Sequence, residues 1–207
     1  MEGDYTNNLV TGVMAVFEQL RELELGLEFA PKSQQAMESF KIAVACVVAA
    51  VLYGIVHDQI TARLCVEYFT IFHPAIFHTQ SPTWLGIGWG ILATWRVGAL
   101  FSVPLIVTAR VGPRPALRAF ELIPSIGFLL AFMAVSAVLF GVAGYVLART
   151  GVLATDALTF SPSRTIRYRF MAVWWAHSAS YASTFIGGAV LSGMTYRRRF
   201  RGYRVVG

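Results

Sequence analysis

The segment Lys41–Ile55, "KIAVACVVAAVLYGI", runs directly into Val56–Pro74, "VHDQITARLCVEYFTIFHP". The first part has the apolar character of a helix that crosses a lipid bilayer. Its apolar run ends at Val56, however, short of the roughly 20 residues that a spanning helix needs. The span is complete only if the helix continues through His57 and Asp58, which would place two polar side chains inside the membrane.

The composition of the whole chain indicates a membrane protein. Of its 207 residues, 56% are hydrophobic and 14% are charged, whereas soluble domains have about 25% charged residues. The mean hydropathy is +0.59. The net charge of +6 comes from short basic clusters beside hydrophobic runs, as in proteins oriented in a bilayer. Because no nucleic-acid-binding motif accompanies these clusters, we expect the lipid bilayer, and not nucleic acid, as the partner.

Four hydrophobic segments predict an all-α integral membrane protein, a bundle of four transmembrane helices. Arg96 interrupts the second segment and His177 the fourth. The short connection over residues 109–120 makes the second and third helices antiparallel neighbours. The expected spans are about 41–70, 84–108, 122–148 and 170–195.

Residues 1–40 are polar and form a segment separate from the transmembrane domain 41–207. Glutamates make one face of this segment acidic, which disfavours binding to anionic lipid. We expect an amphipathic cytoplasmic helix that packs on the protein's own cytoplasmic side or associates with a partner or a second copy. Its apolar residues recur at helical spacing: Leu9, Val13, Val16, Leu20, Leu23 and Leu27.

Arginines at the segment ends predict the orientation. The tail "YRRRFRGYR" (196–204) and the loop "ARVGPRPALR" (109–118) lie on the same side of a four-span protein. That side is expected to be cytoplasmic, together with both termini. Four arginines in the opposite loop, residues 149–169, count against this orientation.

A stripe of small residues over 134–148 predicts a close packing seam between helices, with an oligomer contact as the alternative. Its members are Ala134, Ala137, Gly141, Gly144 and Ala148. Cys46 and Cys65 are expected to be free, because 19 helical positions separate them by roughly 28 Å.

Polar residues within the spans fall into one layer. Along their own helices, Asp58 and His177 lie roughly 25 and 28 Å from the cytoplasmic ends, at a rise of about 1.5 Å per residue. We therefore expect His57, Asp58 and His177 to converge in the outer half of the bundle. Arg96, roughly 18 Å up its helix, comes within reach of Asp58 as an ion-pair partner. On the fourth segment a polar stripe descends from the layer: His177, Tyr181, Thr184 and Gly188.

Glu67 and His73 are outer candidates for the same site. Nine residues separate Glu67 from Asp58, about 180° on a straight helix, so both carboxylates serve one site only if the helix breaks. No Gly or Pro lies between them, which favours an unbroken helix in which Glu67 pairs with Arg63. His73 reaches the site only if residues 73–83 fold back over its mouth.

Three classes of function use this layout. In the first, histidine and carboxylate ligands hold zinc, iron or copper, and the candidate ligands are His57, Asp58, His177 and His73. A hydrolytic or oxidative centre of this kind has as candidate catalytic groups Asp58, Arg96 and Glu67. A b-type haem with His57 and His177 as axial ligands is a variant.

The second class is a proton or ion path, or a transporter, that uses the same polar residues. The third is a non-catalytic subunit of a membrane complex in which these residues only fix the packing. The sequence alone does not decide whether the protein is an enzyme.

Overall fold

The structure is a computed structural model, and it describes residues 32–112, 114–161 and 163–204. Within these ranges the chain is helical and has no β-strand. The long helices are α2 (Lys32–Leu64), α4 (Pro82–Arg110), α5 (Ala119–Arg149) and α6 (Arg164–Arg204), and α3 (Glu67–Ile71) is short. The amphipathic stripe expected between Leu9 and Leu27 lies outside the described residues. Residues 32–40, assigned to that polar segment by composition, are the first turns of α2.

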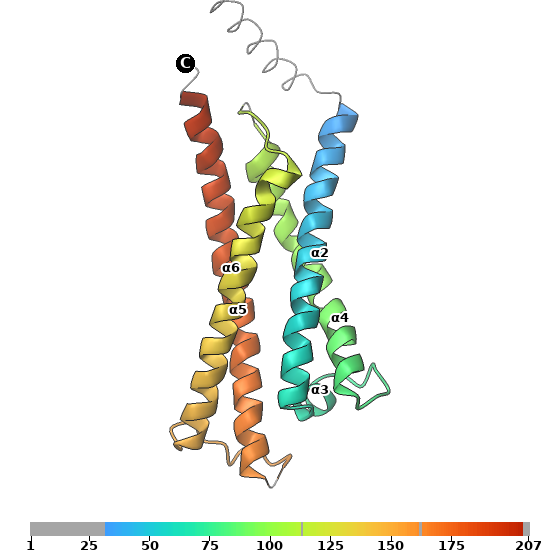
Figure 1. The fold of residues 1–207 in the computed structure, drawn as a ribbon, viewed down its shortest axis with the longest axis vertical. Coiled ribbons are helices and arrows are strands. Elements are labelled where there is room, and N and C mark those ends of the chain that lie inside the picture. Colours follow the sequence, from blue (N-terminus) through green and yellow to red (C-terminus); the bar gives the residue numbers. More distant parts are fainter. Residues whose placement is uncertain (1–31, 113, 162, 205–207) are drawn as a thin grey trace, which may run out of the picture.

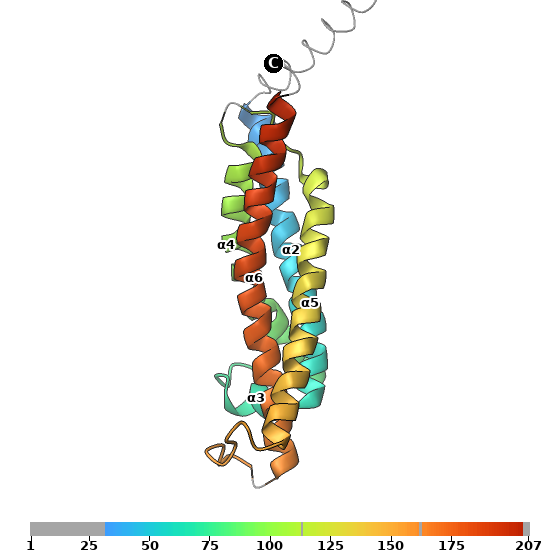
Figure 2. The same cartoon turned by 90° about the vertical axis from the view of Figure 1, so that its left-hand side faces the viewer.

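The long helices lie side by side along the long axis of the molecule (Figures 1 and 2). α2 packs chiefly on α4, and α5 chiefly on α6, while lighter contacts of α2 with α5 and of α4 with α6 join the two pairs. The start of α2 and the end of α6 lie at the same end of the molecule (Figure 1). Which side of the membrane that end faces stays a prediction.

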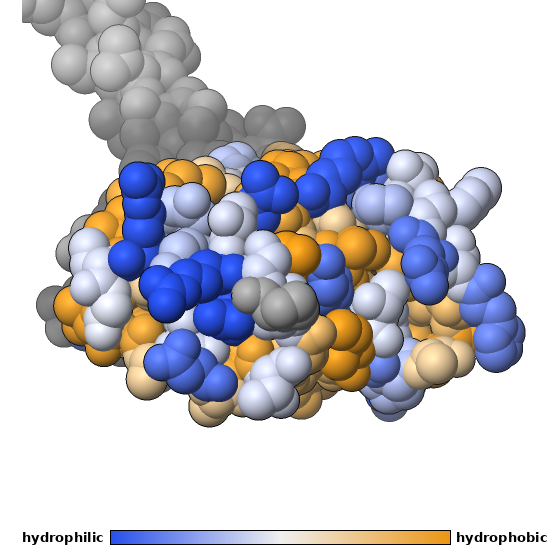
Figure 3. All heavy atoms as spheres, turned by 90° about the horizontal axis from the view of Figure 1, so that it is seen from below, coloured by the Kyte–Doolittle hydropathy of each residue, from blue (hydrophilic) through white to orange (hydrophobic). Residues whose placement is uncertain are grey.

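Three of the helices, α2, α4 and α5, are long and apolar enough to cross a membrane. Their outward faces carry large apolar side chains; Phe128, for example, is 78% exposed. Many large apolar side chains exposed along these helices suit lipid as the solvent. The end of the molecule that carries α3 shows hydrophilic residues among the apolar ones (Figure 3), as expected where a chain leaves the membrane.

Glycines allow the close approach of α2 and α4. A Cβ atom added to Gly90 would lie 2.6 Å from Cα of Ile55, and one added to Gly98 would lie 2.7 Å from the carbonyl oxygen of Cys46. Both neighbours are backbone, so neither could yield easily to a side chain. Small residues are the usual means by which membrane helices come this close.

The small-residue seam of α5 packs on α6 of the same chain. A Cβ atom at Gly144 would meet the carbonyl oxygen of Met171 at 2.8 Å, and one at Gly141 would meet that of Ala172 at 3.3 Å. Ala134, at the other end of the stripe, is exposed. A role for this seam in an oligomer stays a prediction.

The first span does not continue as one helix to residue 70. α2 ends at Leu64, a turn follows at Cys65 and Val66, and α3 begins at Glu67. The expectation of an unbroken helix is therefore wrong at this point. The turn directs Phe69 into the protein, where it is 2% exposed and packs in one cluster with Leu85 and Trp89 of α4. Burial of this ring favours the break although no Gly or Pro is present.

Arg199 fixes the end of the molecule opposite to α3. It is only 4% exposed, and its guanidinium donates hydrogen bonds to four backbone carbonyls. A helix leaves its last carbonyls without intrahelical partners, and Arg199 supplies donors to the end of α4 and to the loop that follows. The acceptors are the carbonyls of Thr108, Val111, Arg114 and Pro115, at 2.6–3.1 Å.

We expect Arg199→Met to lower the free energy of unfolding by about 2–3 kcal/mol, because hydrogen bonds from a charged donor contribute about 1.5–3 kcal/mol and four carbonyls lose their partner together. Unfolding by SDS in mixed micelles measures the change. Arg197→Met is the matched control, because Arg197 is an exposed arginine on the same helix. Equal effects of the two substitutions would contradict a specific role for Arg199.

Candidate functional site

His57 and Asp58 on α2 meet His177 on α6. Each offers one ligand atom, a ring nitrogen or a carboxylate oxygen, and these atoms lie within 4.8 Å of one another. The centroids of the two imidazole rings are 4.5 Å apart. Asp58 and His177 are 5% and 8% exposed. The structure thus brings together the three side chains whose depths along their helices predict a common layer.

The hydrogen bonds of His177 determine which ring nitrogen carries a proton. Nδ1 lies 2.9 Å from the carbonyl oxygen of Val173. A carbonyl oxygen only accepts hydrogen bonds, so Nδ1 is the protonated nitrogen. Nε2 lies 3.2 Å from Oδ1 of Asp58. In a neutral imidazole Nε2 would then point a lone pair at a carboxylate oxygen, and this contact requires either a proton or a cation between the two atoms.

His57 has an unsatisfied ring nitrogen. Its Nε2 is buried and has no hydrogen-bond partner in the described part of the chain. Leaving a buried polar atom without a partner costs about 1–3 kcal/mol, and most buried polar atoms in proteins are paired. The ring of Tyr53 stacks on the imidazole with a centroid distance of 5.7 Å. A polar atom left unpaired beside Asp58 and His177 is what an ion-binding site shows without its ion.

Aromatic side chains of α3 cover the cluster. The ring centroids of Tyr68 and Phe69 lie 4.6 and 5.8 Å from that of His177. Burial, together with the nearby Tyr181 and Asp58, raises the pKa of Tyr68 to about 12. Tyr68 is therefore a neutral phenol at physiological pH. The helix break after Leu64 is what places these rings over the site.

Glu67 and His73 lie outside the cluster. Glu67 accepts a hydrogen bond from the thiol of Cys65 at 3.3 Å. Nδ1 of His73 lies 2.9 Å from the carbonyl oxygen of Tyr68, and its ring packs on those of Phe69 and Trp89. None of these contacts is with His57, Asp58 or His177. A ligand role for His73 and a catalytic role for Glu67 stay predictions.

Arg96 does not pair with Asp58. It is exposed on α4, and its guanidinium lies 5.4 Å from the ring centroid of Trp95. The reason is helical phase: Gly98 faces α2, and a residue two positions away on a helix points about 200° from it. Asp58, the expected partner of Arg96, contacts His177 instead.

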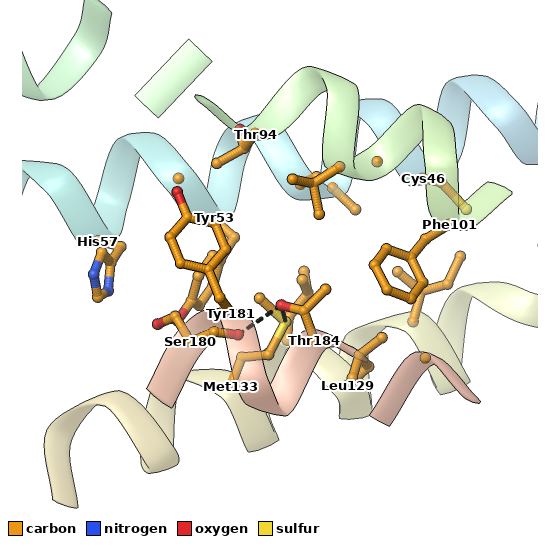
Figure 4. Close-up of a pocket in the computed structure, with 18 of the residues that line it drawn as sticks. Cys46, Tyr53, His57, Thr94, Phe101, Leu129, Met133, Ser180, Tyr181 and Thr184 are labelled. Atoms are coloured by element: carbon orange, nitrogen blue, oxygen red, sulfur yellow. Dashed lines mark hydrogen bonds between the residues drawn. The ribbon is translucent and has the colours of Figure 1, made fainter. Parts of the chain in front are cut away.

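A narrow, mostly apolar cavity extends from the cluster between the long helices. Its volume is about 100 Å³, and α2, α4, α5 and α6 all contribute to its walls. Figure 4 shows Tyr53 and His57 at one end and Cys46 and Phe101 at the other. The polar stripe predicted on the fourth segment, His177, Tyr181, Thr184 and Gly188, lines this cavity.

Sequence reasoning missed the contribution of Tyr53. Its hydroxyl lies 2.8 Å from Oγ of Ser180, and this contact joins α2 to α6 one helical turn from His57. A single tyrosine in an apolar run is common, and no spacing marks it. Thr184 is anchored on the same side, because its hydroxyl donates to the carbonyl oxygen of Ser180 at 2.7 Å.

No protein-family model, curated protein or solved structure matches this chain. The interpretation of the site therefore depends on its own geometry and chemistry.

We expect Cys65 to resist alkylation at about pH 8. A free cysteine has a pKa of about 8.5, but burial, followed by the hydrogen bond to Glu67, raises the pKa of the Cys65 thiol to about 12. The reactive thiolate is then scarce at every pH below that value. Mass spectrometry after iodoacetamide treatment of the Cys46→Ser protein measures the reaction. The same protein unfolded in SDS should react fully; rapid labelling of the folded protein would instead make Cys65 a reactive thiol.

Proposed function

We propose that this chain is a multi-pass membrane protein that binds one transition-metal ion through His57, Asp58 and His177. In this proposal α6 is the fourth spanning helix of the bundle. Its part over residues 170–195 contains no Asp, Glu, Lys or Arg, and it runs alongside the other three helices (Figure 2). The ion would lie between α2 and α6, where these two helices are joined by polar side chains.

The contact between Nε2 of His177 and Oδ1 of Asp58 carries the proposal. A metal ion replaces the repulsion of two lone pairs by two coordinate bonds. The hydrogen bond from Nδ1 of His177 to the carbonyl of Val173 is the second contact that metal-binding histidines usually make, because it fixes the ring and its tautomer. Two imidazoles and one carboxylate suit zinc, and also iron or copper.

The ring geometry favours a bare ion over a b-type haem. Metal–nitrogen bonds of about 2.0–2.1 Å on opposite faces of an iron would separate the two ring centroids by roughly 6 Å. A tetrahedral ion would separate them by roughly 5 Å, closer to the 4.5 Å between His57 and His177. The adjoining cavity of about 100 Å³ is also too small for a macrocycle.

A proton-binding site is the second candidate. One proton between His177 and Asp58 also removes the lone-pair repulsion, and the same contact therefore supports a proton carrier. A carrier needs further polar groups along its path, however, and the cavity below the cluster is lined mainly by apolar side chains such as Leu105, Leu129 and Met133. A lone proton also leaves Nε2 of His57 without a partner. Metal binding accounts for both observations.

We expect the purified protein to contain about one transition-metal ion per chain, as measured by inductively coupled plasma mass spectrometry. His57→Ala, Asp58→Asn and His177→Ala should each reduce the metal content at least tenfold, because each removes a direct ligand. His78→Ala is the matched control, since His78 is an exposed histidine of the loop before α4. It should retain the metal.

Reloading makes the same test independent of the metal present at purification. The chelator-treated wild-type protein should gain thermal stability on addition of Zn²⁺, Fe²⁺ or Cu²⁺, because an ion that binds only the folded state stabilises it. The Asp58→Asn protein should gain none. If the wild-type protein neither contains nor takes up metal, and His177→Ala only lowers Tm, the cluster serves packing and the proposal is wrong.

A further inference from the structure

We infer that the exposed face of α4 around Arg96 binds a membrane-spanning helix of a different protein, and that this helix carries an aspartate or glutamate near its midpoint. The contact is separate from the His57–Asp58–His177 cluster and does not require a metal ion there. It lies where a charged side chain on the outside of the bundle is at the depth of the hydrocarbon.

Arg96 lies at the middle of its span. The segment 84–108 extends roughly 18 Å on either side of it, at a rise of about 1.5 Å per residue, and contains no other charged residue. Arginines near helix ends extend their side chains to the lipid headgroups. From the middle of a hydrocarbon core the headgroups are roughly 15 Å away, further than an arginine side chain extends. Because α4 forms one edge of the bundle (Figure 2), the exposed Arg96 faces hydrocarbon unless another molecule covers it.

The described part of the chain does not neutralise this charge. Its ion pairs join other residues, and none includes Arg96. The ring of Trp95, 5.4 Å from the guanidinium, attracts a cation but carries no charge of its own. Charged side chains in spanning helices almost always face the protein interior or water and pair with one another, because an isolated charge in hydrocarbon is costly. An opposite charge from outside this chain is therefore the missing partner.

The face that carries Arg96 has the pattern of a helix contact. Exposed apolar residues follow it at helical spacing: Leu100, Val103 and Val107. Residues spaced in this way share one face, and this face points away from Gly98, which packs against α2. Lipid tails could cover the apolar residues as well as a helix could, since they are equally apolar. The arginine at the start of the stripe is what favours a protein.

Charge determines which protein fits. A guanidinium matches a carboxylate through two parallel hydrogen bonds, so the partner helix needs an acidic residue at the same depth. A second copy of this chain does not supply one. A symmetric pair of α4 helices would bring two Arg96 side chains together, and like charges repel. An asymmetric contact would need an exposed acid in mid-span, whereas Asp58, the one acidic residue at that depth in the described helices, is buried against His177.

We expect photocrosslinking to capture the partner helix in the membrane of the cells that naturally make this protein. The full chain carries benzoylphenylalanine in place of Val103, and mass spectrometry identifies the crosslinked peptides. The expected product joins Val103 to a hydrophobic segment of another membrane protein, and that segment contains an Asp or Glu. Phe128 on α5 is the matched control position, because it is also exposed and lies at a similar depth, roughly 9 Å into its span against roughly 8 Å for Val103. It should crosslink only to lipid.

Variants of Arg96 test whether its charge holds the contact. Arg96→Leu and Arg96→Gln should each reduce the crosslinking yield at Val103 by about tenfold or more, because each leaves the partner's acid without its counter-charge. Arg96→Glu, combined with exchange of the captured acid for arginine in the partner, should restore the crosslink. The purified Arg96→Leu protein should keep the Tm and the metal content of the wild type, since Arg96 is exposed and makes no ion pair within the described chain.

Three results would overturn the inference. Crosslinks from Val103 that reach only lipid, a second copy of this chain, or a protein segment without an acidic residue would exclude the expected partner. A crosslink to an acidic segment that survives Arg96→Leu would show that the charge does not hold the contact. A lower Tm of the isolated Arg96→Leu protein would assign Arg96 to the fold of this chain. None of these results changes the metal content of the wild-type protein, which tests the proposed function separately.

Discussion

The Asp58–His177 and Tyr53–Ser180 contacts between α2 and α6 join the two halves of this molecule near α3. Within each half, glycines and other small residues let the backbones pack closely, α2 on α4 and α5 on α6. Between the halves the contact is lighter, and it includes the Asp58–His177 and Tyr53–Ser180 pairs. In lipid such groups have no alternative partners in the solvent. The candidate site therefore also joins the two helix pairs.

This division into halves explains why a cavity lies beside the cluster. Small residues allow close packing inside each pair. Larger side chains such as Phe101, Leu129 and Met133 then face the space between the two pairs. Polar contacts join the two pairs near α3, and Arg199 binds the loop after α4 at the opposite end. The space between these two connections is not filled, because no element of the described chain enters it. Site and cavity thus follow from one packing arrangement.

The helical content and the layer of polar residues could be predicted because both depend only on local rules. Apolar runs of sufficient length indicate helices in lipid, and a constant rise per residue places His57, Asp58 and His177 at one depth. The partner of Arg96 could not be obtained from depth alone, since depth ignores direction around the helix. The spacing of Gly90 and Gly98 would have given that direction, because these glycines mark the face that α2 covers.

Other features depend on tertiary contacts that leave no local signal. The break after Leu64 has neither Gly nor Pro and follows from the burial of Phe69 against α4. Arg199 belongs to a basic tail whose sequence predicts exposed charges. In the structure it is buried and donates hydrogen bonds to backbone carbonyls. Every residue type has a backbone carbonyl, so no sequence pattern predicts which carbonyls will be the partners. Tyr53 escaped notice for a similar reason: its partner, Ser180, is 127 positions away.

The contents of the cluster and of the cavity constrain each other through charge. A proton shared by His177 and Asp58 gives an ion pair with no net charge, and the cavity beside it then needs no polar occupant. A divalent ion in the same place leaves one uncompensated positive charge within an apolar bundle. An anion at the end of the cavity that reaches the cluster would compensate it better than the nearest hydroxyls, since those of Tyr53 and Ser180 are already paired. A charged ligand in the cavity is thus the expected counterpart of a metal ion, whereas a neutral one would match a proton.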